Sequence, residues 1–329
     1  MDSEKKDDED KDDDEDDEDD EDDEGEEETG NMEDLEFPAP SLKTVKKEKD
    51  VINMNEKIKK KYGPPYVYMD KLDGTSLVYT GKKLKTTGRT KLRGKNVSHL
   101  IKLLNLPQID KLSGLGVRGE LVMSRKNFLK YREKKIAEGS KNKFDNMRST
   151  VNGFVNAKLK NLDIYGLQLC RFVTFKIFMS EKTKIEQLEE LENNDFDVVW
   201  FEYSDKLNHK IQSNILRERK GLKDKKLISK YDIDGIVIEP NIVDIRNQDT
   251  DKDPEYSFAY KEDNLTRIEI INVIWRLTSK DGLIKPIVII NHRRFDEKNM
   301  SKFTGWNAYQ IINKKIGPGA KGWGCFANS

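Results

Sequence analysis

Cysteine and histidine are scarce in this sequence. Its 329 residues include two cysteines, Cys170 and Cys325, and three histidines. Two cysteines cannot supply a disulfide framework or a four-cysteine zinc site. Cys170 lies in an apolar, strand-like run, where a thiol is expected to be a small buried group. This composition suits a reducing compartment such as the cytoplasm or the nucleus.

Long apolar runs are absent as well. No stretch approaches the ~20 apolar residues needed to cross a bilayer, and the first residues lack the charged-then-apolar pattern of a secretion signal. A G-x-G-x-x-G phosphate loop between a strand and a helix is also missing. We therefore expect a protein that does not enter a membrane and does not use a β-α-β nucleotide fold.

Charge is abundant but unevenly distributed, so the net charge of −1 is misleading. Residues 1–37 contain 25 Asp and Glu but 3 Lys, which leaves 57 Lys and Arg against 36 Asp and Glu in residues 38–329. The acidic segment has almost nothing to bury and is expected to be disordered. The basic remainder has the charge of a nucleic-acid-binding protein. A genome bias toward Lys and Asn is the alternative, but it would not by itself remove acids.

The hydrophobic pattern predicts an α+β fold with antiparallel sheets. Residues 38–61 are expected to form a linker with a short helix at 51–61, and the last 65 or so residues a β-only module. We expect Ser124 to cap a helix. Predicted strands cover 75–87 (as a hairpin), 114–123, 169–178, 233–238, 256–260, 267–276 and 285–290, and predicted helices cover 124–138, 145–160, 181–192 and 209–220.

The most informative stretch is residues 66–81, which read YVYMDKLDGTSLVYTG. Lys71 and Asp73 stand beside Gly74 at the start of a strand-forming run. A lysine in this place is either a surface cation near Asp73 or a nucleophile that must first lose its proton. K-x-D-G alone is too common to decide between them, so the choice depends on the residues that follow.

Four further motifs follow in order: V-R-G-E at 117–120, F-D-N-M-R at 144–148, I-D-G-I-V-I at 233–238 and A-Y-K at 259–261. With K-L-D-G, this set resembles the covalent nucleotidyltransferases, and among them the NAD-dependent DNA ligases, most of all those of large DNA viruses. The resemblance implies a nucleotidyltransferase domain with ATP-grasp-like antiparallel sheets and helices.

The segments SKDGLIKP and TGWNAYQIINKKIGPGA extend the resemblance to about residue 320. They are similar to the start of the family's OB domain. The implied organisation is a disordered acidic tail, a linker, an adenylylation domain and a partial β-barrel OB module, at residues 1–37, 38–61, 62–264 and 265–329.

The resemblance implies a catalytic role for four residues. Lys71 would attack the α-phosphate of NAD and expel nicotinamide mononucleotide. Lys261 would neutralise the phosphate charge that develops, and Asp73 would orient the lysine or a metal. Asp234 would serve as a base or as a tentative Mg²⁺ ligand, since carboxylates with phosphate oxygens are usual Mg²⁺ partners.

Five more residues are implied to bind the nucleotide. Glu120 would hold the ribose hydroxyl, Arg148 would face the phosphate, and Phe178 would stack on the adenine. Arg118 belongs to the same strand motif as Glu120. Arg89 lies in a T-G-R-T-K stretch that corresponds to the family's T-R-G-D-G loop, displaced by one position.

The implied reaction has three steps: enzyme adenylylation, AMP transfer to the 5′-phosphate of a nick, and attack by the 3′-hydroxyl. The implied partner is nicked duplex DNA, bound by a monomer. ATP-using relatives usually carry arginine at the position of Ser76, E-G in place of Asp234-Gly235 and W-x-K-x-K near Lys261. These differences favour NAD over ATP.

The sequence also departs from the family pattern. The acidic residue expected two positions before the nucleophile is Met69, with Asp70 adjacent, and Glu239 stands where a basic residue is expected. The acidic segment and linker occupy the place of the small domain that grips nicotinamide mononucleotide, and the OB module stops early. Two alternatives therefore stay open: a degenerate nucleotidyltransferase-fold protein that binds nicked DNA without turnover, and an ATP-dependent DNA or RNA ligase.

Overall fold

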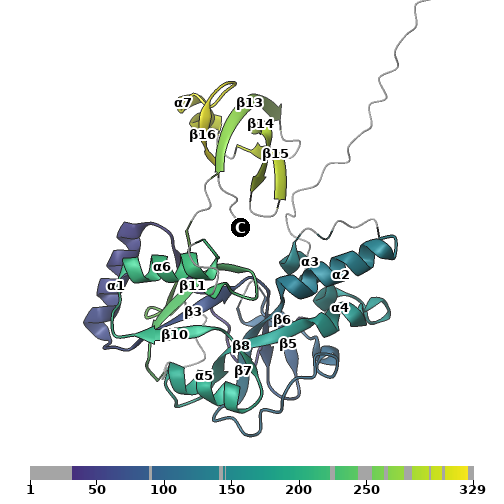
Figure 1. Ribbon diagram of the computed structural model, residues 1–329, viewed down its shortest axis with the longest axis vertical. Coiled ribbons are helices and arrows are strands. Elements are labelled where there is room, and N and C mark those ends of the chain that lie inside the picture. The colour runs from purple at the N-terminus through teal and green to yellow at the C-terminus, as the bar shows by residue number, and fades with distance from the viewer. Residues whose placement is uncertain are drawn as a thin grey trace, which may run out of the picture.

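The protein is described by a computed structural model in which two five-stranded sheets form the main body and a four-stranded sheet stands beyond them (Figure 1). None of the described helices is long and apolar enough to span a bilayer. The structure describes residues 32–88, 91–140, 144, 146–222, 227–243, 254–262, 266–277, 284–295, 298–305 and 308–324.

The first sheet holds the strand of the K-L-D-G motif. All neighbours in it are antiparallel except β12 and β2, which run parallel. Helices α1 (Glu48–Lys61) and α6 (His209–Arg219) contribute to its core. In order across the sheet, the strands are β10 (Phe201–Ser204), β3 (Tyr66–Leu72), β11 (Ile233–Pro240), β12 (Phe258–Tyr260) and β2 (Lys43–Val45).

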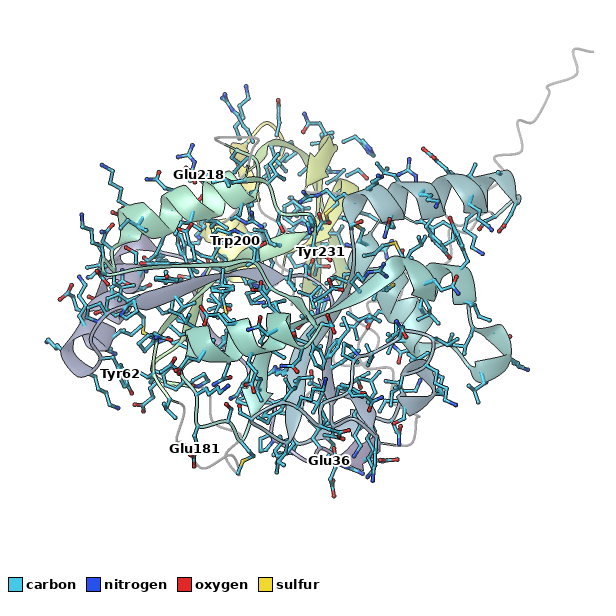
Figure 2. The ribbon with its side chains drawn as sticks, turned by 60° about the horizontal axis from the view of Figure 1, so that its bottom comes forward. Glu36, Tyr62, Glu181, Trp200, Glu218 and Tyr231 are labelled. Atoms are coloured by element: carbon cyan, nitrogen blue, oxygen red, sulfur yellow. The ribbon has the colours of Figure 1, made fainter. Side chains whose placement is uncertain are left out.

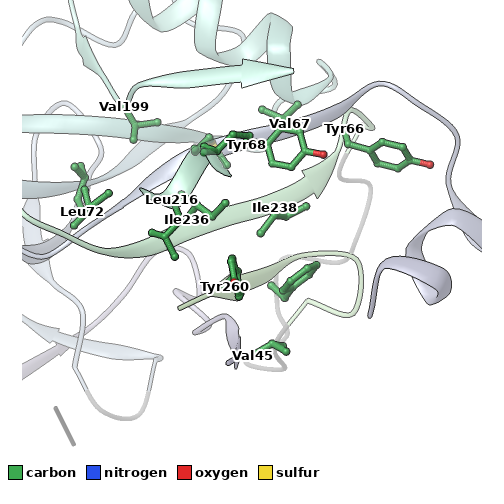
Figure 3. Close-up of a cluster of buried hydrophobic side chains, with 14 of the residues drawn as sticks. Val45, Tyr66, Val67, Tyr68, Leu72, Val199, Leu216, Ile236, Ile238 and Tyr260 are labelled. Atoms are coloured by element: carbon green, nitrogen blue, oxygen red, sulfur yellow. The ribbon is translucent and has the colours of Figure 1, made fainter. Parts of the chain in front are cut away.

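The core of this sheet comes from segments that are far apart in the sequence. Figure 3 shows Val45, Tyr68, Leu216, Ile236 and Tyr260 gathered around β3, β11 and β12, and each is at least 96% buried. At about 25 cal/mol per Å² of apolar surface, such side chains stabilise the fold by roughly 1.5–3 kcal/mol each. The core of the first sheet therefore forms only when residues near Val45 and residues near Tyr260 pack together.

The second sheet begins where the chain leaves β3. Gly74 makes this crossing possible, because a Cβ there would lie 2.5 Å from the carbonyl oxygen of Leu121. Its strands in order are β5 (Leu84–Thr86), β4 (Thr75–Tyr79), β7 (Gly116–Met123), β8 (Cys170–Phe178) and β9 (Asp197–Val198). Its helices are α2 (Arg125–Ala137), α3 (Met147–Asn156), α4 (Ile164–Leu169) and α5 (Lys184–Asn193), with short 3-10 turns at Ser98–Leu100 and Leu159–Asn161.

The third sheet is antiparallel and open over its described residues, so the predicted β-barrel module is wrong in that respect. Its small core is centred on Ile268, Val288 and Ile311. The order is β15 (Lys298–Thr304), β14 (Ile284–Phe295), β13 (Thr266–Leu277) and β16 (Lys321–Gly324), with helix α7 (Ala308–Asn313) packed on β14.

Two expectations for the N-terminal region are wrong. Disorder was expected up to residue 37, but β1 (Met32–Asp34) pairs with β6 (Arg93–Lys95), and Phe37 stacks on Phe178 with 4.8 Å between ring centroids. A linker was expected over 38–61, but this stretch contributes β2 and α1 to the first sheet and its core. Acidic composition did not prevent order because Glu33 and Glu36 pair with the buried Lys85, at 3.3 and 3.0 Å. Residues 1–31 lie outside the described residues.

A buried ion pair fixes the strand just before Lys71. Arg219 of α6 donates to both carboxylate oxygens of Asp70, at 2.8 and 2.7 Å, and Ser229 Oγ donates to the same carboxylate at 2.7 Å. The Arg219 guanidinium lies 4.1 Å from the ring centroid of Trp200, which Figure 2 labels beneath α6. Bidentate, charge-assisted bonds of this kind are strong and geometrically specific.

We expect Asp70→Asn to lower the free energy of unfolding by roughly 3–5 kcal/mol, because removing one charge leaves the buried Arg219 uncompensated. Urea denaturation of parent and variant measures the difference. Glu56→Gln, which breaks the exposed pair between Glu56 and Lys59, is the matched control and should change stability very little. Equal stability losses in the two variants would contradict the assignment.

Candidate active site

A cavity of about 400 Å³ is lined by strands of both large sheets. β3 and β11 contribute from the first sheet, and β7 and β8 from the second. Its wall includes Lys71, Glu120, Phe175, Lys184 and Glu239. Three of the five motifs, K-L-D-G, V-R-G-E and I-D-G-I-V-I, therefore contribute residues to one hollow.

Lys71 sits at the centre of a cluster of charges. Its Nζ donates to Asp234 Oδ2 at 3.1 Å, and Lys261 Nζ donates to the same oxygen at 2.7 Å. Strand pairing produces this contact, because Lys71 lies opposite Gly235 on β11 and Lys261 directly follows β12. Glycine is required at 235, since a Cβ there would lie 2.4 Å from the Tyr260 carbonyl oxygen. One carboxylate thus holds two ammonium groups side by side.

Three buried polar atoms in this region have no hydrogen-bond partner among the described residues: Asp234 Oδ1, Arg118 Nε and Ser76 Oγ. Arg118 and Ser76 line the cavity. Leaving such a group unsatisfied costs roughly 1–3 kcal/mol, and more for a charged one. A ligand with complementary polar atoms would remove this cost, which marks the cavity as a binding site.

Asp73 and Arg148 form an ion pair next to the Lys71 cluster. Arg148 of α3 donates to Asp73 Oδ1 at 3.0 Å. Burial raises the pKa of the Asp73 carboxyl, against the opposing effect of the Arg148 charge. Arg148 therefore pairs with a largely desolvated carboxyl group two residues from Lys71.

Glu120 and Arg118 lie on β7 and both line the cavity. Burial raises the pKa of Glu120 to about 7, although Lys71, Arg118 and Arg148 each favour its charged form. Burial also lowers the pKa of the Arg118 guanidinium, whose Nη1 donates to the Pro40 carbonyl oxygen at 2.8 Å. Both side chains are partly buried in the cavity wall, where their hydrogen bonds to a ligand gain strength.

Phe178 is not in the position that the resemblance implied. Its ring is 1% exposed, is covered by Phe37 and does not line the cavity. Phe175 lines the cavity instead, with its ring 5.9 Å from the Arg118 guanidinium carbon. A register shift accounts for Phe175: Arg118 pairs with Lys176 and Gly119 with Thr174, so Phe175 is an extra residue that forms a bulge. The stacking of Phe37 on Phe178 accounts for the other half of the difference.

Of the nine residues that the sequence singled out, Lys71, Asp73, Asp234, Lys261, Glu120, Arg118 and Arg148 are brought together around Lys71. Arg89 lies outside the described residues. Lys184 and Glu239 were missed as a pair, because no motif links helix α5 to the end of β11.

An amine held by a shared carboxylate, with further cations around one hollow, is the arrangement of charges that the sequence motifs led us to expect. Residues 33–264 match the family model of the NAD-dependent DNA ligase adenylation domain. The chain belongs to this family, as its motifs indicated.

Relatives agree with the match. A DNA ligase of Acanthamoeba polyphaga mimivirus is 32% identical over 88% of this chain and 44% of its own length. A DNA ligase of Clostridium kluyveri is 27% identical over 85% of this chain and 43% of its own. A solved Lig E DNA ligase covers 88% of this chain and 92% of its own, with 14% identity and a TM-score of 0.49. The chain thus spans less than half the length of the curated relatives named here.

We expect Glu120→Gln to make stability less sensitive to pH. The folded-state pKa of about 7 lies above the ordinary 4.5, so the folded parent binds more protons than the unfolded chain between these values. Parent stability therefore falls as pH rises through this window. Because one pKa unit corresponds to about 1.4 kcal/mol, the variant should gain on the order of 1–3 kcal/mol over the parent from about pH 5 to pH 8.

Melting temperatures of parent and variant across this pH range measure the effect. Glu255→Gln, at a side chain that is 90% exposed, is the control and should show no such trend. A constant difference between Glu120→Gln and the parent at every pH would contradict the raised pKa.

Proposed function

We propose that this chain is the catalytic part of an NAD-dependent DNA ligase that forms a lysyl-AMP intermediate on Lys71 and seals nicks in duplex DNA. The observation that carries the proposal is the contact of Lys71 and Lys261 with one oxygen of Asp234, at the end of a cavity shaped by both sheets. Family membership supports NAD as the adenylyl donor.

The first step is a phosphoryl substitution. The lone pair of Lys71 Nζ attacks the α-phosphorus of NAD, a N–P bond forms, and the P–O bond to nicotinamide mononucleotide breaks. The electron pair of that bond leaves on the phosphate of the mononucleotide. Asp234, 3.1 Å from Nζ, is placed to accept the proton that the amine gives up, a role for which its distance is suitable.

The surrounding cations act on the developing negative charge. Lys261 lies beside the same carboxylate and keeps its ammonium near the position of the α-phosphate. Arg148 is oriented by Asp73 at the edge of this cluster. Glu120 is suited to accept a hydrogen bond from a ribose hydroxyl, and Phe175 takes the stacking role that Phe178 cannot have.

Magnesium fits the carboxylates of this site. Asp234 Oδ1 is buried and unpaired within the described residues, so one oxygen is available to a hard cation. The described residues contain no cluster of three or more His, Cys, Asp or Glu side chains that could hold a metal, so phosphate oxygens and water would complete its shell. When bound, Mg²⁺ supplies positive charge to the phosphates.

The remaining steps concern DNA. The excess of basic residues after residue 37 suits binding to the phosphate backbone of a nicked duplex. We propose that the chain acts as a monomer in a reducing compartment, with the adenylylation domain spanning residues 33–264 and an open β module that resembles the start of an OB domain at 265–329. Nothing in the site favours ATP, an RNA substrate or an inactive copy over the NAD-dependent reaction.

Incubation with NAD carrying a label in its adenylate should place one AMP on the peptide that contains Lys71, with release of nicotinamide mononucleotide. Lys71→Ala should abolish the label, because the proposed N–P bond forms on its Nζ. Lys59→Ala, at a partly exposed surface lysine, is the control and should label normally. Labelling from ATP but not NAD would identify the ATP-using type, and duplex binding without label from either would identify an inactive copy.

Lys261→Ala should slow labelling by roughly 10²–10³-fold, the cost of removing one preorganised charge from a transition state. Its melting temperature should stay close to that of the parent, because Asp234 keeps Lys71 as a partner. Single-turnover rates at saturating NAD measure the loss, and Lys261→Arg should restore part of it. A variant that labels at the parent rate would exclude Lys261 from the chemistry.

A further inference from the structure

The last acidic residues of the N-terminal run lie in the described structure, and their contacts show what this run binds. Glu33 and Glu36 pair with the buried Lys85 at 3.3 and 3.0 Å. Asp34 Oδ1 lies 3.2 Å from Arg93 Nε. Each of these acids thus has a cationic partner on β5 or β6.

The pairing of β1 with β6 sets the direction in which the acidic run continues from these contacts. The two strands are antiparallel, with Asp34 opposite Arg93 and Met32 opposite Lys95. Followed toward its start, the chain therefore moves along β6 to Lys95. The Lys95 ammonium reaches the C-terminal end of α3, where it donates to the carbonyl oxygen and Oδ1 of Asn156 at 3.3 and 3.4 Å.

The surface around this end of α3 is basic and free of acids. Residues 74–109 contain eight Lys and Arg and no Asp or Glu, and residues 146–162 contain three and none. Lys158 and Lys160 follow α3, are exposed and pair with no carboxylate of the described residues. Leu159 between them is 68% exposed. The β6–α3 face, as we call it, consists of Lys95, Lys158, Leu159 and Lys160 (Figure 1).

We propose that residues 1–31 dock on the β6–α3 face and act there as an internal competitor of DNA. This segment has 22 acidic residues and 3 lysines, a net charge of −19, which complements a surface with cations and no acids. It joins the structure at Met32, beside Lys95. Its 31 residues reach about 100 Å when fully extended. The tether raises the concentration of the segment at the face to the order of millimolar.

Competition follows because duplex DNA and residues 1–31 are both polyanions that bind exposed lysines. Docking should weaken the binding of duplex DNA most at low salt, since screening reduces the attraction between the segment and the face as salt rises. DNA binding rests on the proposed function, whereas the docking of residues 1–31 does not.

A photocrosslinking p-benzoylphenylalanine at Leu159 of the full chain tests the docking directly. Under ultraviolet light at low salt, it should join the Leu159 peptide to a peptide from residues 1–31 of the same chain. The same group at Ile52, which is 45% exposed on the mixed-charge helix α1 across the body from α3, is the control and should give little of this product (Figure 1). The product should disappear at about 1 M salt, where the Debye length is about 3 Å. Equal yields from the two positions, or crosslinks between two chains alone, would overturn the proposal.

Charge changes measure the competition with DNA. Replacing every Asp and Glu in residues 7–24 by Asn and Gln keeps the chain length and removes 17 negative charges. This change should tighten the binding of a nicked duplex by about 10-fold at about 50 mM salt, and the gain should be lost by about 200 mM. In K158E/K160E the same change should gain less than about 3-fold, because the face no longer attracts acids. K57E/K60E, at exposed lysines of α1, is the matched control and should keep the full gain.

Equal gains in K158E/K160E and K57E/K60E would overturn the competition at this face, and circular dichroism confirms that both variants keep the fold. Two other results separate the proposal from the proposed function. A parent that crosslinks through Leu159 but forms no Lys71 adduct or binds no duplex contradicts the proposed function alone. A parent that forms the adduct and binds duplex, but gives no crosslink to residues 1–31, contradicts the docking alone.

Discussion

The site depends on the antiparallel pairing of β3 with β11. This pairing sets Lys71 opposite Gly235 and puts Asp234 within hydrogen-bond distance of its ammonium. β11 also pairs with β12, which delivers Lys261 to the same carboxylate. A slip of one residue between β3 and β11 would turn Lys71 toward the opposite face of the sheet and separate all three groups.

Because side chains alternate along β3, the adjacent charged residues Asp70 and Lys71 face opposite sides of the sheet. Asp70 points toward α6 and is tied to Arg219 by two hydrogen bonds, while Lys71 points into the cavity. The first contact fixes the backbone that the second requires, because successive strand residues face opposite sides. The buried ion pair of Asp70 and the cavity-facing ammonium of Lys71 therefore come from one short segment.

The grouping of charged side chains around Lys71 could be predicted because these residues lie in compact motifs on strands and one helix. The predictions that were wrong concern features that depend on tertiary contacts. The bulge at Phe175 follows from the pairing of β7 with β8, which local sequence does not encode. The order of residues 32–37 depends on Lys85 and Phe178, and composition alone hides such partners. Lys184 carries no motif, yet it brings a cation next to Glu239, where the pattern led us to expect a basic residue.

The parallel pairing of β2 with β12 has a consequence for how the chain folds. β2 ends at Val45 and β12 begins at Phe258, so the edge of the first sheet closes a loop of more than 200 residues. β3 also has its partners in β10 and β11, which lie more than 120 residues downstream. Contacts of such high sequence separation fold slowly. On the ribosome, the strand that bears Lys71 must therefore wait for most of the domain to emerge, while the β4–β5 hairpin can form at once.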